Sequence, residues 1–95
     1  MFNLDLKDKV ILITGGSDGL GYASAELLSS EGAKVIICGR RGDYLNEKAK
    51  TISENTNNNV LAIQADVSKA EDCKRLVEET ISKFKKIDIL VNNAG

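Results

Sequence analysis

The sequence contains no histidine and no proline, and it has only two cysteines, Cys38 and Cys73. The cysteines form no C-x-x-C pair and no histidine can join them, so the sequence offers no metal site, and we interpret both as reduced packing residues. No apolar run approaches the roughly 20 residues that span a bilayer, and the amino terminus lacks the basic and then apolar pattern of a signal peptide. We therefore expect a cytoplasmic protein that does not bind a membrane.

The sequence also lacks an excess of charge of either sign. Lys and Arg total 13 and Asp and Glu total 14, so the net charge of -1 gives no general attraction to nucleic acid or to an anionic membrane. The hydrophobic fraction of 42% and the charged fraction of 28% are ordinary for a soluble globular protein. Because the 95 residues show neither an internal repeat nor a shift of composition that would mark a linker, we expect one small domain.

One stretch, residues 10–21, organises the chain. It reads V-I-L-I-T-G-G-S-D-G-L-G, and its continuous apolar run predicts a strand covered on both faces of a parallel sheet. The glycines after this run remove side chains where the backbone must bend and where a phosphate could approach bare amides; they are Gly15, Gly16, Gly19 and Gly21. The start of the next helix would attract that anion. The stretch predicts a phosphate-binding turn, with a turn that serves packing alone as the alternative.

The spacing of these glycines distinguishes between possible ligands. A P-loop needs Lys and then Ser or Thr after its last glycine, whereas Tyr22 and Ala23 follow Gly21, which disfavours ATP hydrolysis. The common dinucleotide pattern G-x-G-x-x-G does not fit either, because from Thr14 the sequence reads T-G-x-x-x-G-x-G. That variant resembles the short-chain dehydrogenase/reductase family. The resemblance implies an NAD(P)-binding oxidoreductase.

Strands and helices are expected to alternate along the chain. Apolar runs predict strands at residues 10–13, 34–38, 60–65 and 87–91. Helical spacing predicts helices from the glycine turn to Glu31, over residues 43–54, and from a Ser68–Glu71 capping box to Phe84. Right-handed crossovers then give a Rossmann-like, doubly wound α/β parallel sheet in the order 3-2-1-4, with the first two helices on one face and the third on the other.

Two of these helices carry apolar stripes that we expect to pack on the sheet. In the first helix the stripe is Leu20, Ala23, Leu27 and Leu28. In the third helix it is Cys73, Leu76, Val77, Thr80, Ile81 and Phe84.

The residues after the second strand bear on the choice of nucleotide, because the adenosine ribose would lie near them. An acidic residue there would bind the ribose hydroxyls of NAD, but the sequence has Gly39 followed by Arg40 and Arg41, and arginine suits a 2'-phosphate. Asp18 opposes this preference, because family members that bind NADP often carry a basic residue at its position. The sequence favours NADP over NAD, although two solvated loop arginines would need no ligand.

Two further stretches follow strand ends and resemble family motifs. Asp66 and Val67 resemble the adenine clamp, in which a carboxylate accepts a hydrogen bond from the adenine amino group, although Asp66 could instead belong to a turn. The chain ends N-N-A-G, from Asn92 to Gly95, which resembles the asparagine motif that lies against the cofactor, with a plain turn as the alternative. Three motifs in the expected order support the family assignment more strongly than any one of them.

Tyr44 and Lys48 have the Y-x-x-x-K spacing that the family uses for its proton donor and the lysine that lowers the pKa of that donor. The family pair lies beyond N-N-A-G with a serine before it, whereas this pair follows the second strand. We therefore interpret Tyr44 and Lys48 as part of a solvated helix face.

The resemblance covers almost the whole chain but well under half of a typical family member. It implies that residues 1–95 are the amino-terminal part of a single NAD(P)-binding domain, truncated before the later strands of the family. The catalytic serine, tyrosine and lysine would follow Gly95, so we name no catalytic residue and expect the 95-residue chain to be inactive alone.

The intact protein is expected to be a homo-oligomer that transfers hydride between a nicotinamide cofactor and a carbonyl or alcohol, for example as a 3-oxoacyl or other ketone reductase. A non-catalytic nucleotide-binding sensor or scaffold is the alternative. The predicted cofactor-binding residues are Gly15, Gly16, Ser17, Asp18, Gly19, Leu20, Gly21, Arg40, Asp66, Val67, Asn93, Ala94 and Gly95.

Overall fold

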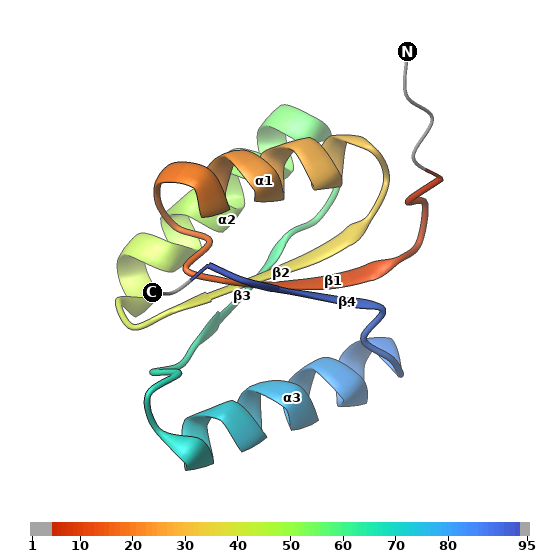
Figure 1. The fold of residues 1–95 in the computed structure, drawn as a ribbon. Helices are drawn as coiled ribbons and strands as arrows, with labels where there is room; N and C mark the ends of the chain where they lie inside the picture. The colour runs from red at the N-terminus through yellow and green to blue at the C-terminus, as the bar shows by residue number, and fades with distance from the viewer. Residues whose placement is uncertain (1–4, 94–95) are drawn as a thin grey trace.

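The computed structural model describes residues 5–93 and contains one parallel sheet with helices on both faces. Its elements in chain order are β1 (Val10–Thr14), α1 (Gly19–Ser30), β2 (Lys34–Gly39), α2 (Gly42–Thr56), β3 (Leu61–Gln64), α3 (Ala70–Phe84) and β4 (Ile89–Asn92). The strand order is β3-β2-β1-β4, and α1 and α2 cover one face while α3 covers the other (Figure 1). The prediction of a doubly wound sheet in the order 3-2-1-4 is confirmed.

The strands contribute side chains to a separate core on each face of the sheet. Ile11, Ile13 and Val35 pack with Leu45 and Ile52 under α1 and α2. On the other face the alternate strand residues pack toward α3; this cluster includes Val10, Leu12, Ile36, Cys38, Ile63 and Leu76. Because successive strand residues face opposite sides, two covered faces require the continuous apolar runs seen in the sequence.

The prediction for the core face of α1 was right for Leu28, which is half-buried against the core, and wrong for the other three residues. Leu20 and Leu27 are 74% and 57% exposed, and Ala23 is also exposed. The buried residues of this helix are Gly21, Ala25 and Ser29. Small side chains allow α1 to lie close to the strands, so the face that is buried carries small residues rather than Leu20 and Leu27.

The predicted stripe of α3 is also wider than the buried face. Leu76 and Thr80, one helical turn apart, are buried, whereas Val77 and Ile81 are 45% and 40% exposed. Val77 directly follows Leu76 and Ile81 directly follows Thr80, so each exposed side chain points about 100° around the helix axis from the buried one before it. Phe84 is half-buried against the core beneath α3.

The predicted capping box is absent from the described part of the chain, because α3 begins at Ala70 and its N-cap Lys69 makes no side-chain cap. The Ser68 backbone amide and hydroxyl both donate to Asp66 Oδ1, at 3.0 and 2.7 Å. Asp72 Oδ2 in turn accepts from the Asp66 amide at 2.8 Å. The Ser68 hydroxyl, which a capping box would use to cap α3, is therefore hydrogen-bonded to Asp66 instead.

Asp88 fixes the start of β4 beside β1. The Val10 amide donates to Asp88 Oδ2 at 2.8 Å, and the Asp88 amide donates to the Val10 carbonyl at 2.9 Å. Lys86 Nζ lies 3.0 Å from the same carboxylate oxygen. The hydrogen bond from Val10, followed by the contact with Lys86, holds the pKa of Asp88 below its usual value.

Candidate functional site

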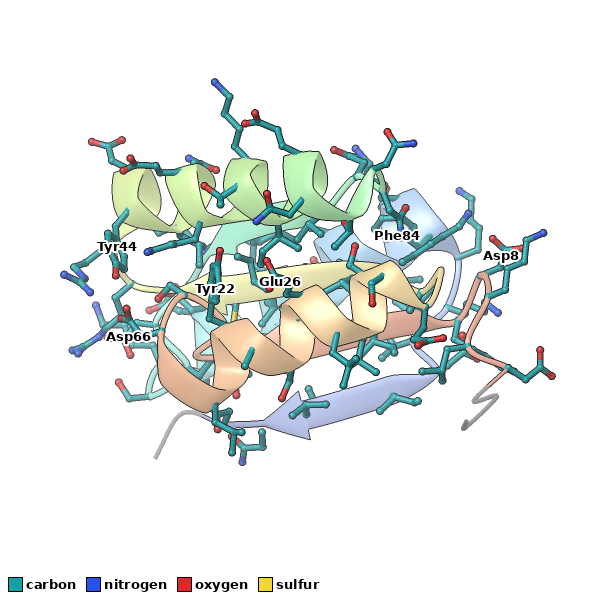
Figure 2. The ribbon with its side chains drawn as sticks, turned by 90° about the horizontal axis from the view of Figure 1, so that it is seen from above. Asp8, Tyr22, Glu26, Tyr44, Asp66 and Phe84 are labelled. Atoms are coloured by element: carbon teal, nitrogen blue, oxygen red, sulfur yellow. The ribbon has the colours of Figure 1, made fainter. Side chains whose placement is uncertain are left out.

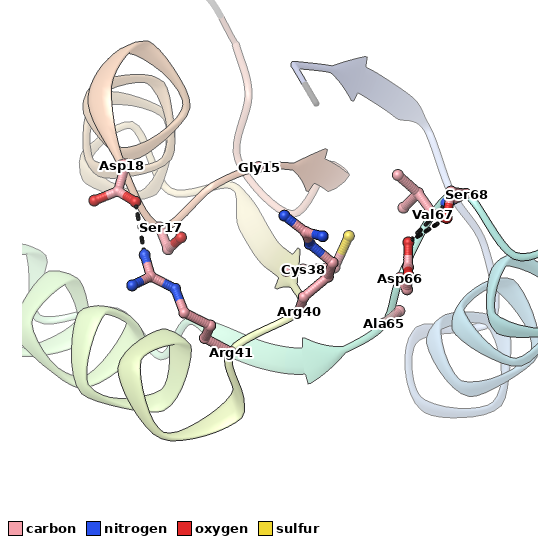
Figure 3. A pocket seen from close by; sticks show the side chains of 11 residues that line it. Gly15, Ser17, Asp18, Cys38, Arg40, Arg41, Ala65, Asp66, Val67 and Ser68 are labelled. Carbon is pink, nitrogen blue, oxygen red and sulfur yellow. Dashed lines mark hydrogen bonds and ion pairs between the residues drawn. The ribbon is translucent and has the colours of Figure 1, made fainter. Parts of the chain in front are cut away.

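A cavity of about 870 Å³ lies at the carboxyl ends of β1, β2 and β3. Its lining comes from the segment after β1 (Gly15, Ser17, Asp18), from the end of β2 and the residues after it (Cys38, Gly39, Arg40, Arg41) and from the segment after β3 (Ala65, Asp66, Val67, Ser68) (Figure 3). Ligands of open parallel sheets bind at this edge, and the volume is in the range of small-molecule sites. Tyr44 and Asp66 lie at this end of the molecule, opposite Asp8 and Phe84 (Figure 2).

The glycine turn brings the start of α1 against the end of β1. A Cβ on Gly21 would lie 2.3 Å from the Gly15 carbonyl oxygen and 2.7 Å from Asn93 Nδ2, so only glycine allows this approach. Asp18 is the N-cap of α1, yet within residues 5–93 its side chain makes no cap hydrogen bond. The amides of the first helical turn, which have no partner within the helix, are left for a ligand.

The predicted residues of the turn differ in their relation to the cavity. Gly15, Ser17 and Asp18 line it. The remaining predicted turn residues are not among its lining residues; they are Gly16, Gly19, Leu20 and Gly21. Gly16 is buried, with Ile37 only 2.5 Å from where a Cβ would stand, so close packing against β2 requires glycine here, and its contact with a nucleotide stays a prediction.

Asp18 is paired with residues at the start of α2. Arg41 Nη2 lies 3.4 Å from Asp18 Oδ2, and the Tyr44 hydroxyl donates to Asp18 Oδ1. The Arg41 guanidinium carbon lies 4.3 Å from the centre of the Tyr44 ring, and Lys48 Nζ lies 5.1 Å from the same centre. The interpretation of Tyr44 and Lys48 as a solvated face was wrong, because both are half-buried in a charged and aromatic cluster.

Arg40 differs from its neighbour in having no ion-pair partner among residues 5–93. Its backbone carbonyl accepts a hydrogen bond from the Gln64 side chain at 2.9 Å, which holds the residue at the end of β2. Its side chain is exposed and lines the cavity between Arg41 and Asp66 (Figure 3). The pKa of Asp66 is lowered chiefly by its hydrogen bonds from Ser68 and more weakly by the nearby charge of Arg40, so this guanidinium lies near the Asp66 carboxylate without forming an ion pair with it.

Asp66 lines the cavity and also organises the segment after β3. Its Oδ1 atom accepts from both the amide and the hydroxyl of Ser68, as in a turn. The side-chain hydrogen bond from Ser68, followed by the backbone one, holds the pKa of Asp66 below its usual value. Val67 is held by its carbonyl, which accepts from Cys73 Sγ at 3.2 Å. The turn role of Asp66 is observed, and its contact with adenine stays a prediction.

The two asparagines at the end of β4 bind back to β1. The Asn93 amide donates to Thr14 Oγ1 at 2.9 Å, and the Thr14 hydroxyl lies 3.2 Å from Asn92 Oδ1. Asn93 Nδ2 donates to the Gly15 carbonyl at 3.4 Å. One asparagine side chain of the N-N-A-G stretch thus binds the backbone of the glycine turn. The predicted site residues Ala94 and Gly95 lie outside the described residues.

Several residues that line the cavity were not among the predicted cofactor-binding residues. No site role was predicted for Cys38, Ala65 and Ser68, whereas Gly39 and Arg41 were expected near the ribose of the nucleotide. Their positions at or just after strand ends could have identified them, because those ends meet at one edge of a parallel sheet. Burial raises the pKa of the Cys38 thiol to about 11. Cys38 therefore lines the cavity as a neutral thiol.

Residues 5–93 contain no cluster of three acidic or cysteine side chains that could hold a metal ion. No helix in the same range combines the length and apolarity that a membrane crossing requires.

Comparison with known proteins gives matches over nearly the whole chain. The chain is 40% identical to 11-beta-hydroxysteroid dehydrogenase A of Sesamum indicum, over 100% of this chain and 27% of that protein. The structure of L-sorbose reductase from Gluconobacter frateurii, complexed with NADPH and L-sorbose, matches with a TM-score of 0.95 and 39% identity over 99% of this chain and 36% of that one. NAD+-bound xylitol dehydrogenase matches with a TM-score of 0.90 and 28% identity, over 96% of this chain and 35% of that one.

The chain thus spans between 27% and 36% of the length of these three relatives. Residues 9–95 also match the family described as short chain dehydrogenase. Since that match includes all the elements that line the cavity, the chain belongs to the short-chain dehydrogenase family.

Proposed function

We propose that this chain is the nucleotide-binding part of an NAD(P)-dependent oxidoreductase. The observation that carries the proposal is the cavity at the carboxyl edge, which combines a helix N-terminus, the exposed guanidinium of Arg40 and the carboxylate of Asp66. A nicotinamide dinucleotide presents an anionic pyrophosphate, an adenosine ribose that carries a 2'-phosphate in NADP, and an adenine with an amino group. Each of these groups has a residue of complementary chemistry at this edge.

The residues suggest a direction for the bound nucleotide. The pyrophosphate lies on the amides at the start of α1, close to Gly15 and Ser17. The adenine lies between Asp66 and Val67, with its amino group donating to the carboxylate oxygen of Asp66 that Ser68 leaves open. The nicotinamide ribose then extends toward Asn93 and the end of β4. The nicotinamide supplies the hydride-transfer chemistry, and this chain binds and orients the nucleotide.

The same residues favour NADP over NAD. Gly39, at the end of β2, provides no carboxylate to bind the ribose hydroxyls, and the Arg40 side chain is available for a 2'-phosphate. The negative charge of Asp18, which would repel a 2'-phosphate, is paired with Arg41 and hydrogen-bonded to Tyr44. Its repulsion of the phosphate is therefore reduced. The reported relatives include complexes with NADPH and with NAD+, so the fold itself accepts either nucleotide.

For the whole protein, we propose hydride transfer between the nicotinamide and a carbonyl or alcohol substrate. The alternative is a nucleotide-binding sensor without turnover. Single-turnover experiments with a panel of ketones distinguish the two, because only an enzyme oxidises its bound NADPH. Cytoplasmic location, homo-oligomeric assembly and the inactivity of residues 1–95 alone remain predictions from the sequence.

Arg40→Ala tests the nucleotide preference. The variant is expected to lower the ratio of NADPH to NADH affinity roughly tenfold to a hundredfold, because it removes a charge-assisted contact that only the 2'-phosphate makes. Both dissociation constants are measured by the fluorescence of the reduced nicotinamide in the full-length protein. Lys50→Ala is the matched control, because it removes an exposed cation of α2 that is not among the residues of this cavity. An unchanged ratio in Arg40→Ala would contradict the assignment of Arg40.

A further inference from the structure

Asp18 is an unexpected residue in a cavity proposed to bind a phosphate. Its carboxylate lines the same cavity as Arg40, and an unpaired carboxylate there would repel the 2'-phosphate and attract the Arg40 guanidinium. The described structure shows no Asp18–Arg40 ion pair, because Asp18 is bonded to α2 instead. The feature that directs Asp18 toward α2 therefore bears on nucleotide preference.

Both oxygens of the Asp18 carboxylate have partners on α2 or just before it. Oδ2 lies 3.4 Å from Arg41, and Oδ1 accepts from the Tyr44 hydroxyl. The side chains of Arg41 and Asp18 are 70% and 60% exposed, and such exposed ion pairs hold their geometry weakly. Tyr44 is half-buried and contributes twice, since its hydroxyl binds Asp18 and its ring lies under Arg41 at 4.3 Å. The less mobile member of the cluster is Tyr44.

We propose that Tyr44 is a positioning residue that determines the preference for the 2'-phosphorylated nucleotide. It holds the Asp18 carboxylate against Arg41, so that Asp18 does not compete with the phosphate for Arg40. This inference rests on the proposed function and concerns specificity only. Tyr44 takes no part in proton transfer, although its spacing from Lys48 resembles that of a catalytic pair.

The test is Tyr44→Phe, which removes only the hydroxyl and keeps the ring under Arg41. Without the hydroxyl, Asp18 Oδ1 is released and its charge acts on Arg40 and on the phosphate. The dissociation constant of NADPH is expected to rise about threefold to tenfold, while that of NADH changes less than about twofold. The rate constant kcat at saturating NADPH stays near that of the wild type.

A double-mutant cycle with Asp18→Asn separates this role from a structural one. If Tyr44 acts through the Asp18 charge, then adding Tyr44→Phe to D18N leaves the NADPH dissociation constant unchanged. Tyr22→Phe is the matched control, because Tyr22 also faces Lys48, at 5.3 Å, but is not a partner of Asp18. That control is expected to leave both dissociation constants as in the wild type.

The outcomes are distinguishable. Equal losses of NADPH and NADH affinity in Tyr44→Phe, or the same loss with and without D18N, would assign Tyr44 to the fold and overturn the inference. Failure of the wild type to bind either nucleotide would overturn the proposed function instead. If Tyr44→Phe does not fold, Arg41→Ala tests the same arrangement: its loss of NADPH affinity is expected to be larger in the presence of the Asp18 carboxylate than in D18N, and equal losses would refute the proposal.

Discussion

Gly21→Ala is expected to destabilise the protein strongly by separating three segments that meet at one glycine. The residue lies in the first turn of α1 and is buried. A methyl group there would lie 2.3 Å from the Gly15 carbonyl oxygen and 2.7 Å from Asn93 Nδ2. Because the nearest obstacle is backbone, a change of rotamer cannot relieve the contact. The helix must move away from the end of β1.

The size of the effect follows from this displacement. Non-bonded heavy atoms pack at roughly 3.5 Å, so α1 must shift by about 1 Å. Overpacking of this kind costs roughly 1 to 3 kcal/mol, and the hydrogen bond from Asn93 to Gly15 is lost with it, at about 1 kcal/mol. We therefore expect the free energy of unfolding to fall by about 3 kcal/mol, out of a typical total of about 5 to 15.

Gly19→Ala is the matched control within the same turn. Gly19 has φ +54°, and a Cβ there would have nothing within 4 Å. Its cost is therefore the left-handed backbone conformation alone, about 1 kcal/mol, partly offset because alanine restricts the unfolded chain. The two substitutions add the same methyl group, which meets backbone at Gly21 and open space at Gly19, where only the backbone conformation is strained.

Urea unfolding followed by far-UV circular dichroism measures both variants. The midpoint is expected to fall clearly for Gly21→Ala and only slightly for Gly19→Ala, with similar m-values. Equal losses in the two variants, or a neutral Gly21→Ala, would refute the argument that close approach is what this position requires.

Three further predictions follow from other parts of the structure. The pKa of Asp88 is lowered in the folded state, so the stabilising effect of this carboxylate is present above the unfolded pKa of about 3.9 and is lost as pH falls through the folded value. The Tm of Asp88→Asn should therefore depend less on pH between about 6 and 3 than the Tm of the wild type. Burial keeps the Cys38 thiol protonated, so iodoacetamide at pH 8 should modify it only after unfolding, as peptide mass spectrometry would show, and rapid native modification would count against the buried assignment. Residues 1–95 expressed alone should self-associate in size-exclusion chromatography, because Leu20 and Leu90 are 74% and 61% exposed and β4 lies at an edge of the sheet; a monomer at high concentration would contradict this.

The sequence alone was sufficient to predict the fold, for reasons that are local or topological. The continuous apolar runs in β1 and β2 predict strands with two covered faces, and the handedness of crossovers then fixes the side on which each helix packs. The positions of Asp66 and Asn93 after strand ends predicted the edge of the sheet at which the cavity lies. These predictions needed no knowledge of which side chains meet.

Only the tertiary structure decided which face of α1 is buried and what Asp18 contacts. Leu20 and Leu27 belong to the stronger apolar pattern of α1, but the close approach of the helix to the sheet buries Gly21 and Ala25 instead. Asp18 is separated from Arg41 and Tyr44 by 23 and 26 residues, and the packing of α1 beside α2 brings them together. Local sequence patterns describe one element at a time, whereas contacts between elements depend on the distance and rotation at which they pack.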